Sequence, residues 1–340
     1  MPVRHQEKDR AVVVAGVGGW VPPNVVTNDD LCARLDTSDE WIRTRTGIST
    51  RHVISPGMAT SDLAVEAARR ALASAGDPEI GAVVLATTTP DRLCPATAPD
   101  VAARLGLVGV PAFDISAVCA GFLYGLATAA GLIAHGTARQ VLLIGADAFT
   151  TLIDAKDRST AVIFADGAGA VVLRAGQAGE LGAVGPVVLG SDGRFADLIE
   201  VPAGGSRQRS RNGSYEPGDE FFRMAGRDTF RQAVKWMSTA SRHAVEAAGW
   251  RLEDIDRFAA HQANARILKA VADELAVPAG RRLSNISRVG NTGAASIPLL
   301  LAQAAEDGGL VEGHRILLTA FGGGLSWGAA TLTWPRLPAA

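Results

Sequence analysis

The sequence predicts an α/β protein in which short buried strands alternate with helices. Short apolar runs recur between segments of helical spacing throughout the 340 residues. Hydrophobic residues make up 47% of the chain, aromatic residues only 5%, and there are 38 glycines. Such small side chains let helices and sheets pack closely in layers. A chain of this length forms two subdomains or one large layered domain.

Short runs of apolar and β-branched residues predict the strands. Several runs lack polar residues altogether, as is typical of strands buried on both faces. We expect strands at residues 12–17, 83–87, 141–145, 162–164, 171–173, 187–190, 258–260, 316–320 and 329–334.

Alanine-rich or amphipathic segments between these runs predict the helices. We expect helices at residues 61–75, 120–135, 227–248, 265–276 and 296–306. A stretch of glycines and small residues at 176–185 separates two parts of similar size, each with a long helix flanked by strands. We therefore expect two related halves, residues 1–178 and residues 179–340.

Charge and cysteine content limit the function classes. A formal net charge of −2 argues against a nucleic-acid-binding protein, which needs a basic face. The only cysteines are Cys32, Cys94 and Cys119, an odd and sparse set that suits a reducing cytoplasm better than a disulfide framework. The apolar stretch at 11–19 is too short and glycine-rich for a signal peptide or membrane span. We expect a cytoplasmic protein that binds neither nucleic acid nor membrane.

Cys119 is the first candidate functional residue. It ends a strand-like stretch that begins at Phe113, and Ala120-Gly121 and a helix-compatible segment follow it. The N-terminus of a helix carries a partial positive charge and free N–H groups, which favour a thiolate and offer donors to an oxyanion. Taken alone, however, a cysteine here is more simply a buried structural residue.

Three later motifs supply partners for a reactive thiol. His261-Gln-Ala-Asn264 lies where a strand end turns into an amphipathic helix. Gly290-Asn291-Thr-Gly precedes a helix of small residues, and Phe321-Gly-Gly-Gly closes a strand with glycines that let a ligand approach the backbone. Individually these motifs are also explained by a structural histidine, an asparagine turn and a tight glycine turn.

In combination, these motifs are far more specific. Their order along the chain resembles β-ketoacyl-acyl-carrier-protein synthase III of the thiolase superfamily, and the resemblance covers nearly the whole chain. Matching segments also lie at residues 36–48, 157–159 and 164–169. The resemblance implies a thiolase-like, five-layered αβαβα fold of two similar halves, the first carrying the nucleophilic cysteine and the second the histidine and asparagine.

The resemblance also implies a reaction and its residues. An acyl group from acyl-CoA joins malonyl-acyl carrier protein with loss of carbon dioxide, and neither a metal nor a cofactor is needed. Cys119 would carry the acyl group, and the N–H groups of Cys119 and Gly323 would bind the oxyanion. His261 and Asn291 would donate hydrogen bonds to the enolate.

Further residues match the family's substrate sites. Trp41 and Arg158 match the positions that sandwich the adenine of CoA, Arg45 with Thr37 would hold the nucleotide portion, and Asn264 would bind the pantetheine arm.

Acyl carrier protein is acidic, so docking needs local positive charge. The candidate docking residues lie in pairs three or four positions apart on two helices, namely Arg231, Lys235, Arg266 and Lys269. Solvated helix surface is an equally good interpretation of them. Asp273 and Glu274 depart from the family, whose bacterial members often carry lysines there, and this puts the usual carrier in doubt.

Cys94 is a second departure. The matching segment of the family reaches across a homodimer, where a Phe-like residue limits the partner's acyl pocket. A cysteine leaves more room, so the sequence predicts an acyl pocket suited to a starter larger than acetyl.

Alternative functions remain at this stage. A cysteine peptidase also uses Cys, His and Asn in this order, but Ala117-Val118 precedes the thiol where papain-like enzymes have Gly-Ser. A relative from a natural-product pathway could transfer an acyl group to a hydroxyl, an amine or a carrier without decarboxylation. A noncatalytic carrier-binding scaffold is a third class. Neither the acyl-CoA starter nor the choice between fatty-acid and polyketide pathways follows from the sequence.

Overall fold

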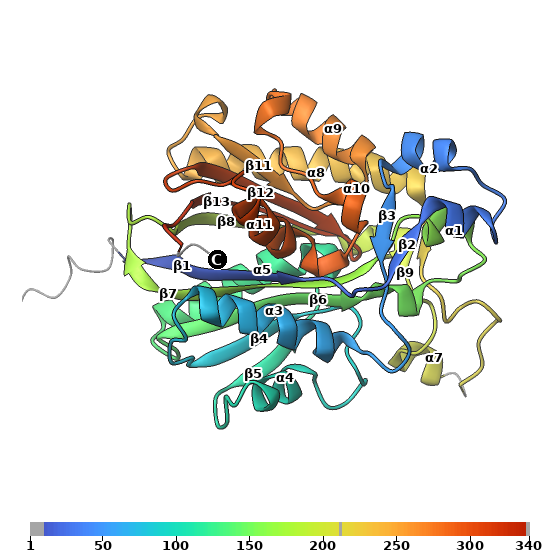
Figure 1. Cartoon of the computed structure of the whole chain (residues 1–340), viewed down its shortest axis with the longest axis horizontal. Coiled ribbons are helices and arrows are strands. Elements are labelled where there is room, and N and C mark those ends of the chain that lie inside the picture. Colours follow the sequence, from blue (N-terminus) through green and yellow to red (C-terminus); the bar gives the residue numbers. More distant parts are fainter. Residues whose placement is uncertain (1–9, 211–212, 338–340) are drawn as a thin grey trace, which may run out of the picture.

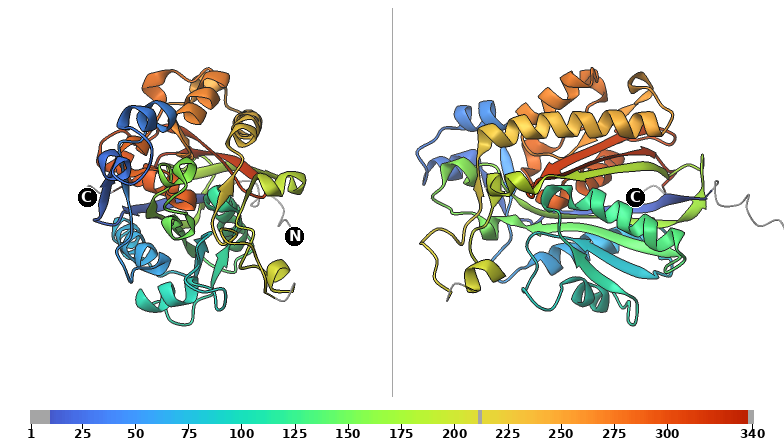
Figure 2. Two further views of the ribbon diagram at one scale, coloured as in Figure 1. Left: turned by 90° about the vertical axis from the view of Figure 1, so that its right-hand side faces the viewer. Right: turned by 180° about the vertical axis from the view of Figure 1, so that it is seen from behind.

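The protein is a layered α/β structure with helices on both outer faces and in its centre. The computed structural model describes residues 10–210 and 213–337. Helices α8 and α9 cover one outer face, α3 and α4 cover the other, and α5 and α11 lie between two layers of strands (Figure 1). Views from the side and from behind show the same arrangement (Figure 2). The predicted layered α/β class is therefore correct.

The strands form one large sheet and two small ones. The bounds are β1 Arg10–Trp20, β2 Val25–Thr27, β3 Thr50–His52, β4 Ala82–Ala86, β5 Ala112–Ile115, β6 Gln140–Ala148, β7 Asp166–Gln177, β8 Ala183–Ser191, β9 Ile199–Glu200, β10 Arg223–Met224, β11 Arg257–Ala260, β12 Arg315–Gly322 and β13 Ser326–Thr333. The large sheet has the order β11-β12-β13-β8-β1-β7-β6-β4-β5. Its two parts are joined where β1 pairs with β8, through Val12 with Val184 and Val13 with Ala183.

The helices include all five that the sequence predicts. The bounds are α1 Asn28–Cys32, α2 Asp39–Thr46, α3 Thr60–Ser74, α4 Ala98–Arg104, α5 Gly121–Ala134, α6 Arg158–Ala161, α7 Ser206–Arg209, α8 Gly226–Ala247, α9 Ala265–Glu274, α10 Ile286–Val289 and α11 Ser296–Glu306. Two 3₁₀ turns matter for the site: η1, Val118–Ala120, leads into α5, and η6, Gly293–Ala295, leads into α11.

One predicted strand is wrong. Residues 162–164 form no strand: they follow α6 in a turn, and only Phe164 makes an isolated bridge, to Asn291. Their apolar character has another cause, because Val162, Ile163 and Phe164 pack into a buried cluster with Phe149 and Phe222. Burial alone does not distinguish a strand from such a turn. The short elements β2, β3, β9 and β10 carry no periodic signal and were not expected.

The two central helices are held very close to the sheet. A Cβ on Gly125 of α5 would lie 2.4 Å from Leu143 Cδ1, and a Cβ on Gly169 of β7 would lie 2.3 Å from the backbone nitrogen of Leu299 in α11. The backbone of α11 cannot move aside as the end of the Leu143 side chain can, so glycine at 169 sets the distance between β7 and α11. Both helices begin at the same end of the sheet, where η1 and η6 meet.

The expected boundary after residue 178 falls in the turn between β7 and β8. The two-half division, 1–178 and 179–340, remains a proposal, and its outermost residues, 1–9 and 338–340, lie outside the described residues.

Replacing Gly169 by alanine tests the close packing of α11. The new methyl group meets backbone atoms of Pro298 and Leu299, which cannot rotate away. We expect Gly169→Ala to lower the free energy of unfolding by about 1 to 3 kcal/mol in urea denaturation followed by circular dichroism. Gly131, in α5 with open space around it, is the control; alanine there should be neutral or stabilising by up to about 1 kcal/mol. Equal effects at both positions would contradict this account.

Candidate functional site

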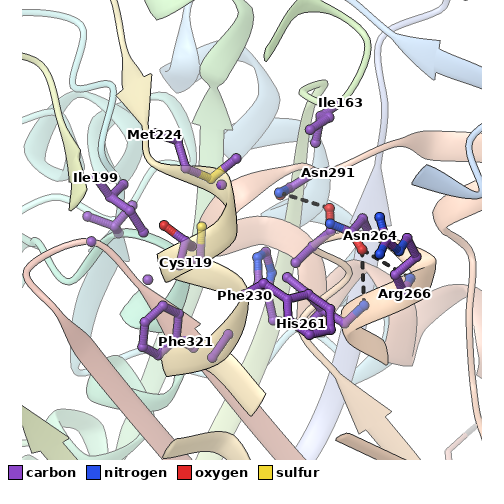
Figure 3. A pocket seen from close by; sticks show the side chains of 18 of the residues that line it. Cys119, Ile163, Ile199, Met224, Phe230, His261, Asn264, Arg266, Asn291 and Phe321 are labelled. Atoms are coloured by element: carbon purple, nitrogen blue, oxygen red, sulfur yellow. Dashed lines mark hydrogen bonds between the residues drawn. The ribbon is translucent and has the colours of Figure 1, made fainter. Parts of the chain in front are cut away.

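The three sequence-predicted reactive side chains meet in one cavity. Cys119, His261 and Asn291 all line a pocket of about 610 Å³. Figure 3 shows that their side chains point toward a shared space from three different segments. Those segments are the η1 turn, the end of β11 and the loop before η6.

The backbone presents Cys119 to the cavity through a strained turn. Val118, directly before it, has φ of +47°, a region that β-branched residues rarely adopt. On the other side, Gly322 packs so closely that a Cβ would lie 2.7 Å from the Cys119 backbone nitrogen. The cysteine is thus fixed between the end of β5 and the glycine turn after β12.

The state of the thiol differs from the sequence-based expectation. The helix end was expected to favour the thiolate, but burial, and after it the Asp147 carboxylate, raises the pKa of Cys119 well above its ordinary value. Desolvation of a charged sulfur outweighs the partial charge at a helix N-terminus. The enclosed site therefore favours the neutral thiol in the resting protein.

His261 is also neutral. It is 2% exposed, its backbone N–H donates to the Thr319 carbonyl at 2.8 Å, and its Nδ1 has no hydrogen-bond partner among the described residues. Burial lowers the pKa of His261 to about 3. The imidazole therefore has one N–H donor and one free acceptor nitrogen at neutral pH.

The amide of Asn291 has a defined orientation. Its Oδ1 accepts a hydrogen bond from the Gly293 backbone N–H at 3.0 Å, and its Nδ2 faces the Ala263 carbonyl at 3.4 Å, on the cavity side (Figure 3). Because Gly293 N–H needs an acceptor, the oxygen must lie on that side and the NH₂ group must face the cavity. Backbone bonds to Ile163 and Ala165 anchor the residue further.

Gly323 lines the same cavity, in the turn between β12 and β13. A Cβ there would approach Ile199 to 3.1 Å, so a side chain would narrow the space beside the thiol. This turn and η1 bring backbone atoms of residues 119 and 323 to one wall of the cavity.

Of the residues expected to bind CoA, Arg45 and Asn264 line the cavity, and Trp41 and Arg158 lie beside Arg45. The guanidinium of Arg158 lies 5.0 Å from the Trp41 ring centroid, that of Arg45 lies 5.9 Å from it, and Arg158 also donates to the Asp36 carbonyl at 2.7 Å. The ring face expected to stack on adenine is therefore covered by Arg158. The hydroxyl of Thr37 is buried without a hydrogen-bond partner among the described residues.

Asn264 lines the cavity and also caps α9. Its Oδ1 accepts from the N–H groups of Arg266 and Ile267, both at 3.0 Å. The side-chain oxygen is thus committed to the helix, as is typical of an N-cap residue. Only the NH₂ group remains for a ligand.

Four basic side chains expected to dock a carrier protein lie on α8 and α9 and differ in their partners. Arg231 pairs with Asp228, and Lys269 pairs with Asp273 at 2.5 Å. Lys235 lies 4.4 Å from the Trp236 ring, and Arg266 lies 6.0 Å from that of Phe230; within residues 10–210 and 213–337 neither forms an ion pair.

The negative charges of Asp273 and Glu274 are largely balanced by nearby basic side chains. Asp273 accepts from Arg282 at 2.9 Å in addition to Lys269, and Glu274 lies 3.6 Å from Arg242. The departure from the family pattern therefore adds less negative charge to this surface than the sequence alone implies.

Cys94 does not join the other site residues. It is exposed in the loop after β4 and does not line the cavity that contains Cys119 of the same chain.

Sequence reasoning missed the apolar wall of the cavity. It is formed mainly by Ile163, Phe164, Ile199, Phe222, Met224, Phe230 and Phe321. Most of these residues lie in loops or short elements without periodicity. Asp147, buried behind the site, was also missed, although a carboxylate at the end of the apolar run 141–145 was a readable signal.

Within the described part of the chain there is no group of three or more side chains suited to a metal ion. A search of the same residues for a helix long and apolar enough to cross a membrane finds none.

Comparisons with known proteins show which family the chain belongs to. Residues 113–193 match the family model described as 3-oxoacyl-[acyl-carrier-protein] synthase III, and residues 245–334 match its C-terminal model. "Beta-ketoacyl-[acyl-carrier-protein] synthase III 3" of Streptomyces coelicolor is 57% identical, over 96% of this chain and 98% of its own. The synthase III of Pseudomonas aeruginosa PAO1 is 52% identical, over 96% and 98%.

Solved structures show the same similarity. FabH of Pseudomonas aeruginosa PAO1 superposes with a TM-score of 0.91 at 50% identity, over 96% of this chain and 99% of that one. The priming β-ketosynthase of the R1128 polyketide pathway gives a TM-score of 0.90 at 34% identity, over 99% and 100%.

The neutral state of the thiol is testable by alkylation. Because burial and Asp147 raise its pKa, the rate at which iodoacetamide modifies Cys119 should still be rising above pH about 8.5, where an ordinary thiol is half ionised. Peptide mass spectrometry assigns the label, and Cys119→Ser gives the background from Cys32 and Cys94. A plateau well below pH 8.5 would show a thiolate in the resting protein.

Proposed function

Because the chain belongs to the 3-oxoacyl-[acyl-carrier-protein] synthase III family, we propose that it is a condensing acyltransferase acting through an acyl-Cys119 intermediate. It takes the acyl group of an acyl-CoA and condenses it with malonyl-acyl carrier protein. The products are 3-oxoacyl-acyl carrier protein, CoA and carbon dioxide. The observation that carries the proposal is the neutral His261 beside a donor-oriented Asn291 in the cavity of Cys119.

The first half-reaction forms the acyl-enzyme. Cys119 Sγ attacks the thioester carbonyl of acyl-CoA while the free nitrogen of His261 accepts the thiol proton. The N–H groups of Cys119 and Gly323 are the proposed donors to the oxyanion. Collapse expels the CoA sulfur, which takes the proton from His261. This transfer leaves His261 in the neutral form that burial favours.

In the second half-reaction, His261 and Asn291 act as hydrogen-bond donors in the same cavity. Malonyl-acyl carrier protein loses carbon dioxide, and the electron pair of the broken bond becomes an enolate on the thioester. His261 N–H and Asn291 Nδ2–H donate to the enolate oxygen. The enolate carbon then attacks the acyl-Cys119 carbonyl, and the cysteine sulfur leaves as a thiolate that takes a proton from solvent water. No redox step or metal is needed.

The rival functions fit less well. A peptidase of the papain type needs a thiolate paired with an imidazolium, whereas here burial favours both neutral forms. Acyl transfer without decarboxylation needs no second donor such as Asn291. A noncatalytic scaffold gives no reason to keep a nucleophile, histidine and asparagine in one enclosed cavity.

We assign the remaining sequence-predicted residues to substrate binding. Trp41, Arg158, Arg45 and Thr37 would hold the nucleotide of CoA once Arg158 moves from the Trp41 ring, and the NH₂ of Asn264 would contact the pantetheine arm. Arg231, Lys235, Arg266 and Lys269 would dock the acidic carrier protein, with Lys235 and Arg266 having the most available charge. A homodimer in the cytoplasm completes the proposal, and the three free cysteines suit that compartment.

The function is tested by combining mass measurement with gas release. Incubation with a mixture of acyl-CoAs should add one acyl mass to Cys119, which also identifies the starter, and malonyl-acyl carrier protein should then release carbon dioxide and form the 3-oxoacyl product. Acyl transfer to another acceptor without carbon dioxide release would favour the rival acyltransferase. Failure to acylate with any acyl-CoA would refute both.

Asn291→Ala separates the two half-reactions. Asn291 is proposed to act only on the enolate, so acylation of Cys119 should persist while condensation falls by about 10²- to 10³-fold. Intact mass measures the first step and product formation the second. Asn285→Ala is the matched control, because Asn285 is buried on the same segment but binds Gln303 outside the cavity. Equal loss of both steps in Asn291→Ala would rule out the assigned role.

Cys94 is proposed to shape the acyl pocket of a partner subunit. Its smaller side chain leaves space for a branched or longer starter, so Cys94→Phe should shift acyl-CoA turnover toward acetyl, whereas Cys94→Ser should leave the preference unchanged. Turnover across a series of chain lengths provides the measurement. If native protein and Cys94→Phe both accept only acetyl-CoA, the prediction fails. Light scattering tests the dimer that it requires.

A further inference from the structure

Asp147 is a buried carboxylate that the proposed reaction does not use. It lies near the end of β6 and is 0% exposed. No cationic side chain in the described part of the chain pairs with it, and its hydrogen-bond partners are all neutral. Burial raises the pKa of Asp147 to about 6, although four hydrogen bonds act in the opposite direction. Such a group is costly to keep in a core, and an apolar residue would avoid that cost.

The two oxygens of Asp147 hold two different segments. Oδ1 accepts from the Thr88 backbone N–H at 2.6 Å and from the hydroxyls of Thr87 and Thr89 at 3.2 and 3.3 Å. Oδ2 accepts from the Ala294 backbone N–H at 2.7 Å. One carboxylate therefore joins the loop after β4 to the turn that follows Asn291.

The second of these contacts lies next to the amide of Asn291. In the η6 turn, Gly293 N–H donates to Asn291 Oδ1 and Ala294 N–H donates to Asp147 Oδ2. The contact is close, because a Cβ on Gly293 would lie 2.2 Å from Asp147 Oδ2. If the turn moved, the acceptor side of Asn291 would lose its partner and the direction of its NH₂ group would no longer be fixed.

The same turn touches the nucleophile helix. A Cβ on Gly121, two residues after Cys119, would lie 3.3 Å from Ala294 Cβ, and a Cβ on Gly145 would lie 2.4 Å from the Ala294 carbonyl oxygen. Ala294 is thus fixed by β6, by the start of α5 and by Asp147. The position of Ala294 therefore sets where Asn291 lies relative to Cys119.

We propose that Asp147 is a positioning residue for the condensation half-reaction, which fixes the η6 turn and thereby aims the Asn291 amide at the enolate. This inference rests on the function proposed above. Asp147 touches no substrate in this role and acts through Asn291. It predicts that loss of the carboxylate affects condensation far more than acylation of Cys119.

The test is a double-mutant cycle with separate assays of the two half-reactions. Asp147→Asn keeps the size of the side chain but cannot accept from both Thr88 and Ala294. We expect condensation to fall by about 100-fold, whereas acyl-Cys119 formation should fall by no more than about threefold, because loss of the carboxylate charge lowers the pKa of the thiol and does not oppose its attack. When Asn291→Ala is already present, adding Asp147→Asn should lower the remaining condensation rate by no more than about twofold, because the amide that Asp147 positions is gone.

Asp114→Asn is the matched control. The Asp114 carboxylate accepts from the N–H groups of Thr97 and Ala98, both at 2.7 Å, and so anchors the other end of the loop that Asp147 holds. Condensation by Asp114→Asn should stay within about twofold of native. If Asp114→Asn and Asp147→Asn lose condensation equally, Asp147 acts through the loop and the proposal is wrong. The proposal would also be overturned if the effects of Asp147→Asn and Asn291→Ala on the free energy of activation for condensation were fully additive. It would likewise fail if Asp147→Asn slowed acylation of Cys119 as much as it slows condensation.

Two further measurements keep the test decisive. If Asp147→Asn does not fold, as judged by circular dichroism, Thr87→Val removes one bond to the same carboxylate, together with the acceptor of the Thr89 N–H. It should lower condensation selectively by a smaller factor, and no selective loss there counts against the proposal. Failure of the proposed function is recognised separately, because native protein would then release no carbon dioxide from malonyl-acyl carrier protein.

Discussion

The close packing of α5 and α11 between the strand layers is the constraint on which the site depends. Gly169 lets α11 lie against β7 at a distance from the helix backbone that no Cβ would allow, and Gly125 leaves room for the Leu143 side chain beneath α5. Because both helices start at the same end, the turns before them come into contact. One turn carries Cys119 and the other follows Asn291, so two segments far apart in sequence form one reaction centre.

Burial then determines how these groups act. A solvent-exposed cysteine and histidine could form an ion pair, but this cavity disfavours charge on both. Neutral groups suit a reaction in which the protein must donate hydrogen bonds to an enolate and avoid trapping a proton. The buried carboxylate of Asp147, near this cavity, accepts hydrogen bonds from the backbone N–H groups of Thr88 and Ala294.

The sequence predicted those helices, strands and site residues that have a local pattern of apolar residues or a short motif. The five long helices and most of the strands follow apolar periodicity, and the motifs around residues 119, 261, 291 and 323 do lie at one cavity. Three features could not be predicted in this way. The 162–164 run is buried by a cluster of phenylalanines and not by a sheet, the pKa of Cys119 depends on enclosure by distant segments, and Arg158 lies on the Trp41 ring through a contact between α6 and α2.

The contact of Arg158 with Trp41 also bears on the order in which the proposed substrates use the site. An adenine that stacks on Trp41 must first displace a guanidinium already lying on that ring, so the binding energy gained is the difference between two stacking contacts. On the assignment proposed above, the exchange would reduce the net stacking energy of acyl-CoA and of free CoA alike. Weak net stacking would let spent CoA leave and free the cavity for a carrier-bound substrate, whose pantetheine arm ends in a protein instead of an adenine.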